Sequence, residues 1–109
     1  MVEEYVVIVD EDAKINLRSI YNWLKENESI SVAVKVRDGI TTAITQLSKM
    51  PQRHAVAHEI DNDKIIYRRA LQWSYKIVFV VEEDFKTVYV VDITHSRRSP
   101  KWLEEKFSK

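Results

Sequence analysis

Three apolar segments in the second half of the chain, rich in β-branched and aromatic residues, restrict its fold more than any other feature. They cover residues 64–71, 75–81 and 87–95. Such runs are typical of β-strands, and the connections between them are short enough for hairpins. We therefore expect the three strands to run antiparallel, as a meander.

The middle strand is apolar at both alternating sets of positions, and Lys76 is its one charge. A strand covered on one side only normally carries polar residues at every second position. We therefore expect the second face of the sheet to be partly covered, either by a partner chain or by residues 100–107, whose apolar side chains have helical spacing.

A short strand and two amphipathic helices are predicted before these strands. The first strand covers residues 5–9, and apolar residues then recur every three or four positions over residues 11–28. A second helix is predicted from a serine cap at position 29 or 31 up to Met50, with Gly39 where the two helices approach closely. With residues 51–63 as a loop, the order β-α-α-β-β-β predicts an α+β fold in which a helical hairpin packs on a small antiparallel sheet.

Length and composition exclude several classes of protein. The 109 residues suit a single domain over residues 1–109. The chain has no cysteine, which excludes disulfides and favours a reducing compartment. No apolar run approaches the roughly 18 residues needed to cross a membrane, and the acidic N-terminal segment is unlike a secretory signal, so we expect a cytoplasmic protein without a membrane partner. The single glycine excludes a glycine-rich phosphate loop, and no cofactor is expected.

Two histidines raise the question of a metal site. His54 and His58 have the i, i+4 spacing that suits a metal on a helix. The residues between them lack the glutamate of a zinc protease motif, and no third ligand is evident. We therefore expect no metal.

Charge is distributed unevenly along the chain, although the formal net charge is zero. Residues 1–31 hold three basic and seven acidic side chains, whereas residues 32–109 hold fourteen basic and ten acidic ones. Overall neutrality argues against strong, indiscriminate binding to nucleic acid, because affinity for phosphates rises with the number of cations brought to the backbone. A local basic surface remains possible. Cations and a histidine gather at the ends of the predicted strands, where they form either a solvated rim or a binding site: Arg68, Arg69, His95, Arg97 and Arg98.

Four stretches of the sequence carry a resemblance to a known family. They read EDAKINLRSIYNWL, AITQLSKMPQRH, YRR…YKIVFVV and VYVVDITHSRR. In their order and spacing the chain, from Tyr5 to about Arg98, resembles the RelE/ParE toxins of bacterial type II toxin–antitoxin systems, often called plasmid stabilisation proteins. The resemblance implies the fold derived above, a toxic activity, and a cognate antitoxin that wraps an extended or helical segment around the toxin.

The family has two kinds of target, and the fold alone does not choose between them. RelE-like members cut messenger RNA on the ribosome, which requires an acid, a base and cations around the reacting phosphate. Lys76 departs from the family's usual Tyr-Arg-Ile, and lysine lacks the planar fork that grips two phosphate oxygens. The candidates for catalysis are His95, Arg68, Arg69, Lys76 and Arg97, and those for binding RNA or another target are Arg53, His54, Glu59, Arg98 and Lys101, with Glu59 also a candidate base.

ParE-like members inhibit DNA gyrase, for which a protein-binding surface is sufficient. Trp73, Trp102 and Arg98 are of the residue types that usually anchor such interfaces. Trp73 is equally well explained as a hairpin residue folded back onto the core. A further alternative is a decayed family member that binds its antitoxin without harming the cell. The chain is expected to form either a homo-oligomer or a hetero-oligomer with its antitoxin.

Overall fold

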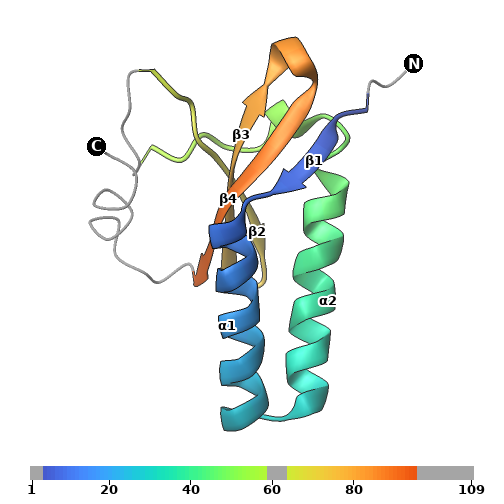
Figure 1. Cartoon of the computed structure of the whole chain (residues 1–109), viewed down its shortest axis with the longest axis vertical. Coiled ribbons are helices and arrows are strands. Elements are labelled where there is room, and N and C mark those ends of the chain that lie inside the picture. The colour runs from blue at the N-terminus through green and yellow to red at the C-terminus, as the bar shows by residue number, and fades with distance from the viewer. Residues whose placement is uncertain (1–3, 59–63, 96–109) are drawn as a thin grey trace.

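The computed structural model describes residues 4–58 and 64–95, and it confirms the predicted order of elements (Figure 1). Two short 3₁₀ helices, Pro51–Arg53 and Glu83–Phe85, lie in the connections. The principal elements are β1 (Val6–Val9), α1 (Glu11–Asn27), α2 (Ile30–Gln46), β2 (Arg68–Gln72), β3 (Tyr75–Glu82) and β4 (Thr87–His95).

The four strands form one sheet in the order β1-β4-β3-β2. Strands β2, β3 and β4 form the predicted antiparallel meander, and the turn between β2 and β3 consists of Trp73 and Ser74. Strand β1 pairs with β4 in parallel, so the sheet is mixed rather than wholly antiparallel. The register between β3 and β4 shifts at Val78–Phe79, where Val91 is the extra residue of a bulge.

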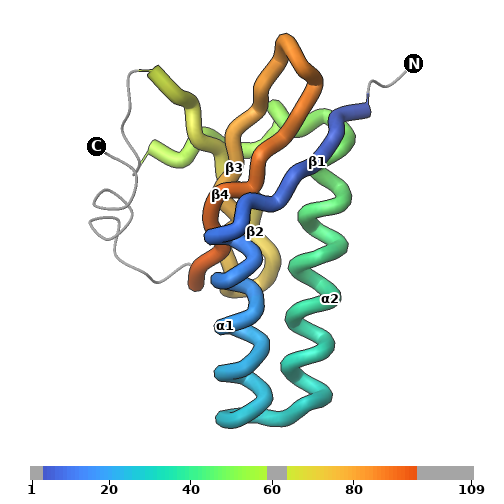
Figure 2. The backbone as a smooth tube through the Cα atoms, in the orientation of Figure 1, coloured from blue at the N-terminus to red at the C-terminus, as the bar shows by residue number. Residues whose placement is uncertain are grey.

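The two helices run side by side, and their connecting turn lies at the end of the molecule opposite the tip of the β3–β4 hairpin (Figure 2). Glu11 and Asp12 occupy the first turn of α1, where carboxylates interact favourably with the helix dipole. Helix α2 is capped by Ser29, whose hydroxyl accepts a hydrogen bond from the Val32 N–H at 3.1 Å. Of the two predicted caps, the structure uses the first.

Helix α2 ends at Gln46, four residues before the predicted end at Met50. The prediction followed the apolar stripe, which continues to the fully buried Leu47. The backbone turns away because the Ser48 carbonyl accepts a hydrogen bond from the Tyr5 N–H at 2.8 Å, and Met50 takes a left-handed conformation (φ 49°). The chain thus leaves the helix to support the approach to β1.

The core lies between the helices and one face of the sheet. Residues of α1 and α2 pack there against the inward positions of β2, β3 and β4. Phe79, Ile77 and Ile40 are among its largest fully buried side chains. The helical hairpin therefore covers one face of the sheet, as predicted.

The second face of the sheet is partly covered, as predicted, but the described part of the cover is neither a partner chain nor residues 100–107. Ala57 and Tyr67 pack against Val78 in a second buried cluster. The Ala57 N–H donates to the Tyr67 carbonyl at 2.7 Å, and the Arg69 N–H to the Ala55 carbonyl at 2.9 Å. The segment after α2 therefore runs along the start of β2, a strand that begins at Arg68 and not at the predicted position 64. Residues 100–107, one of the two predicted covers, lie outside the described residues.

Gly39 marks a close approach, but its neighbour is not α1. A Cβ atom at this position would overlap the ring of Trp73, which lies at the β2–β3 turn. Trp73 has a left-handed backbone (φ 53°) and remains 54% exposed while its ring rests on α2. The tryptophan is therefore folded back onto the domain without being buried in it.

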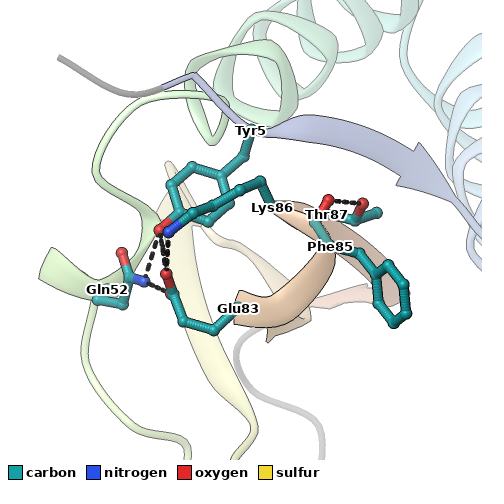
Figure 3. A network of polar contacts seen from close by, with 6 residues as sticks. All are labelled: Tyr5, Gln52, Glu83, Phe85, Lys86 and Thr87. Atoms are coloured by element: carbon teal, nitrogen blue, oxygen red, sulfur yellow. Dashed lines mark hydrogen bonds and ion pairs between the residues drawn. The ribbon is translucent and has the colours of Figure 1, made fainter.

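A polar network joins three distant parts of the chain near the tip of the β3–β4 hairpin (Figure 3). The Tyr5 hydroxyl donates to the Glu83 carboxylate at 2.8 Å, and the amide nitrogen of Gln52 donates to both groups. The Lys86 ammonium lies 2.6 Å from the same carboxylate. These hydrogen bonds lower the pKa of Glu83, the one from Lys86 most of all. The network holds the approach to β1, the segment after α2 and the hairpin tip together.

Candidate functional site

The strand register decides which face of the sheet each of the two β2 arginines occupies. Arg68 has the same parity as the core residue Ala70 and pairs with Phe79, so it lies on the helix side. Arg69 pairs with Val78 and lies on the opposite, open face. Only Arg69 therefore belongs to the side of the sheet that the helices leave uncovered.

Lys76 lies on the same open face as Arg69. It pairs with Leu71 on β2 and with Thr94 on β4, which makes it a diagonal neighbour of both Arg69 and Asp92. Lys76 is only 5% exposed, and Asp92 is fully buried. The open face thus carries two cations and a carboxylate on adjacent strands, with the lysine largely withdrawn from solvent.

His95 lies on the opposite face, at the end of β4. It pairs with Tyr75, and the two rings meet edge to face with centroids 5.5 Å apart. Burial raises the pKa of Tyr75. Both rings line a cavity of about 390 Å³ together with α1 residues that include the exposed Trp23. The structure therefore does not bring His95 together with Arg69 and Lys76, because the sheet lies between them.

Three other predicted residues do come together, at the start of β2. His54 follows the 3₁₀ helix that carries Arg53, and its ring packs edge to face on Phe79 with centroids 5.6 Å apart. Arg68, which pairs with Phe79, donates a hydrogen bond from Nη1 to the His54 carbonyl at 2.8 Å. Burial lowers the pKa of His54, and the charges of Arg53 and Arg68 lower it further. This cluster lies about 13 Å along β3 from His95, since Phe79 is four positions from Tyr75, the partner of His95.

The remaining predicted site residues, Glu59, Arg97, Arg98 and Lys101, lie outside the described residues, as does Trp102. Among residues 4–58 and 64–95, no three His, Cys, Asp or Glu side chains are grouped so that they could hold a metal ion. No helix in the same ranges combines the length and the apolar character needed to cross a membrane.

A groove between the helices and β1 was not foreseen from the sequence. It has a volume of about 750 Å³ and lies between α1, α2 and β1, with an apolar floor that includes Val7, Val9 and Leu17. The basic residues along it are Lys14, Arg18 and Arg37. Arg37 lies over the Tyr21 ring at 5.2 Å from its centroid. The sequence feature that could have indicated the groove is the i, i+4 spacing of Lys14 and Arg18, which puts both cations on the same face of one helix.

Comparison with known proteins places this arrangement in a family. The model of the ParE toxin of type II toxin-antitoxin systems, parDE, matches residues 7–100. No curated protein matches the chain.

Solved structures share the fold at low sequence identity. The chromosomal ParDE toxin–antitoxin system from P. aeruginosa has a TM-score of 0.68 and 15% identity, covering 85% of this chain and 97% of that one. A mutant of the E. coli toxin RelE in the free state has a TM-score of 0.60 and 15% identity, with coverages of 95% and 98%. The toxin–antitoxin complex RelBE2 from Mycobacterium tuberculosis has a TM-score of 0.59 and 16% identity, with coverages of 84% and 91%. Together with the family match over most of the chain, these observations lead to one conclusion: the chain belongs to the ParE toxin family of type II toxin–antitoxin systems.

Proposed function

We propose that this chain is a growth-inhibiting toxin that acts in the cytoplasm by binding a protein target, DNA gyrase, without cutting RNA. A cognate antitoxin neutralises it by binding the toxin. The family match supports the toxin role, and the choice of mechanism depends on the geometry of the sheet.

The observation that carries the mechanism is the separation of His95 from Arg69 and Lys76. Cleavage at a phosphate needs an acid or base within hydrogen-bond reach of the group that the cations hold. Here the imidazole and the two cations lie on opposite faces of the sheet. Lys76 is also largely buried, which does not suit a direct phosphate ligand.

The end of the sheet near His95 instead offers exposed aromatic side chains. Trp23 is 59% exposed and lines the cavity shared by Tyr75 and His95, and Trp73, two residues before Tyr75, is 54% exposed. Tryptophan and tyrosine are the side chains that most often anchor protein interfaces. This surface, defined by Trp23, Trp73, Tyr75 and His95, is the proposed contact for the target.

The groove between α1, α2 and β1 suits the antitoxin. Its apolar floor offers area for an amphipathic segment, and Lys14, Arg18 and Arg37 along it attract carboxylates. The proposed occupant is therefore an amphipathic segment of the antitoxin that carries acidic residues. Related structures are complexes of a toxin with its antitoxin.

RNA cleavage is the second candidate, and one observation favours it. Arg69 lies on the open face, beside the charge of its diagonal neighbour Lys76, and its guanidinium group can bind a phosphate through paired hydrogen bonds. In this candidate the acid or base comes from a residue other than His95.

Induced expression separates the two candidates. For the gyrase mechanism we expect growth arrest with intact transcripts in primer extension, and inhibited supercoiling when the purified chain is added to gyrase. Trp23→Ala should relieve the inhibition, whereas Arg69→Gln should not. Cuts at defined codons that disappear in Arg69→Gln would replace this proposal with RNA cleavage, and an absence of growth arrest would point to a decayed toxin.

A further inference from the structure

Arg53, His54 and Arg68 form a compact cationic cluster that the proposed mechanism does not use. We propose that this cluster is a binding site for a phosphate-type oxyanion, either a phosphodiester of a nucleic acid or a free inorganic anion. The site would exist whether or not the chain inhibits gyrase, because it lies at the start of β2, whereas the aromatic surface lies at the β2–β3 turn and the start of β3.

The backbone holds the cluster in place before any ligand arrives. Pro51 is buried and starts the 3₁₀ helix, and the His54 N–H donates to the Pro51 carbonyl at 3.3 Å. Residue Val56 then forms a bridge with Arg68 itself, so the segment that carries Arg53 and His54 is paired with the start of β2. A site built on paired backbone loses little freedom on binding, which favours affinity.

The two guanidinium groups retain donors for a ligand. Arg68 uses one N–H for the His54 carbonyl, and a guanidinium has five. Arg53 is exposed. Within residues 4–58 and 64–95, the ion pairs are Arg37–Asp38 and Lys86–Glu83, and neither Arg53 nor Arg68 contacts a carboxylate. Guanidinium groups bind oxyanions through paired, charge-assisted hydrogen bonds.

His54 makes the site sensitive to protonation. The described charged neighbours of its ring are Arg53 from the 3₁₀ helix and Arg68 from β2, while Phe79 from β3 adds no charge. Both neighbours, together with burial, lower the pKa of His54, so the ring is largely neutral near pH 7. An anion bound beside it would offset the two positive charges and raise that pKa. Binding should therefore take up a proton and strengthen as the pH falls.

The test measures binding to the full chain with two probes whose own charge does not change in the relevant range. One is sodium sulfate, followed by calorimetry, and the other is a fluorescent single-stranded oligothymidylate, followed by anisotropy. Titrations are made at about pH 7.5 and about pH 5.5, on either side of the ordinary pKa of histidine. We expect tighter binding at the lower pH and net proton uptake when calorimetry is repeated in buffers of different ionisation enthalpy.

Three variants make the test specific. Arg53→Gln should weaken binding by about tenfold or more, since it removes a charge-assisted contact at an exposed residue with no structural hydrogen bond from its side chain. Lys25→Gln, which removes an exposed cation from the last turn of α1, is the control and should bind like the original chain. His54→Gln should retain binding near pH 7.5 but lose the strengthening at lower pH.

Binding of both probes with loss in Arg53→Gln supports a phosphodiester ligand, and binding of sulfate alone with the same loss supports a free anion. Failure of both probes, or equal affinities of the original chain and Arg53→Gln, would overturn the proposal. Arg68→Gln also removes the hydrogen bond to His54, so its result counts only if its thermal unfolding matches that of the original chain.

Discussion

Replacing Gly39 by alanine should destabilise this protein, although the replacement of glycine by alanine usually stabilises a helix. Alanine is favoured over glycine in a helix interior by about 1 kcal/mol. At Gly39, however, the new methyl group would overlap the Trp73 ring and force it off α2. Two opposing effects therefore compete at this one position.

The exposure of Trp73 gives the size of the opposing effect. The residue is 54% exposed, so a little under half of its surface is covered. A tryptophan side chain has one of the largest surface areas among the aromatic residues, so the covered part is roughly 100 Å². Burial of that area contributes about 2.5 kcal/mol to stability. The value falls to about 2 kcal/mol because a compact unfolded state already covers some of this surface. The loss of the Trp73 contact, about 2 kcal/mol, exceeds the gain of about 1 kcal/mol in helix propensity. Gly39→Ala should therefore lower the free energy of unfolding by about 1 kcal/mol.

A double-mutant cycle isolates the contact. Trp73→Ala alone should cost about 2 kcal/mol, and Gly39→Ala made in that background should stabilise by about 1 kcal/mol, because nothing then opposes the methyl group. The assay is urea unfolding followed by circular dichroism for the four proteins. If Gly39→Ala stabilises the original chain as much as it stabilises Trp73→Ala, the packing of Trp73 on Gly39 does not contribute and the reasoning is refuted.

Three further predictions concern the Ser29 cap, the half-buried His54 and the groove between α1, α2 and β1. Ser29→Ala should lower the free energy of unfolding by about 1 kcal/mol, since it removes the cap of α2, and denaturant unfolding with an unchanged m-value would check this. The pKa of His54 is lower in the folded chain than in the unfolded one, so the unfolded chain binds the proton more readily. The contribution of His54 to the free energy of unfolding is therefore complete above about pH 6.5 and decreases as the pH falls below that value. His54→Gln should flatten that decline in unfolding curves taken from neutral to mildly acidic pH, and an unchanged decline would contradict the assignment. Arg18→Glu should weaken binding of the cognate antitoxin, measured by calorimetry, whereas Lys25→Glu, in the last turn of α1, is the control that should leave it unchanged.

The element order was predictable because each segment carries its own periodicity. The partner of β1 was not, since the pattern of residues 6–9 says that they form a strand but not which strand they pair with. The end of α2 was placed too late for a related reason: Leu47 completes the apolar stripe, while the hydrogen bond that ends the helix comes from Tyr5, more than forty residues earlier. Periodicity reports burial and does not report distant backbone partners.

The candidate site was less predictable than the fold. Which of Arg68 and Arg69 faces the open side depends on the register between β2 and β3. A turn one residue longer or shorter would change that register, and here the two-residue turn Trp73–Ser74 places Arg69 on the open face. The same parity argument puts Lys76 and His95 on opposite faces, although both lie in strands at the same end of the sheet. The cluster of Arg53, His54 and Arg68 joins a loop to a strand start through a backbone pairing that no local pattern announces.

The parallel pairing of β1 with β4 also bears on how the protein comes into being in the cell. Residues 6–9 must wait for residues 87–90 before their strand has a partner, so the sheet closes only when most of the polypeptide has left the ribosome. Contacts of such long sequence separation slow folding. Strand β1 therefore finds its partner only near the end of synthesis, and the four-stranded sheet is complete only in a nearly full-length polypeptide.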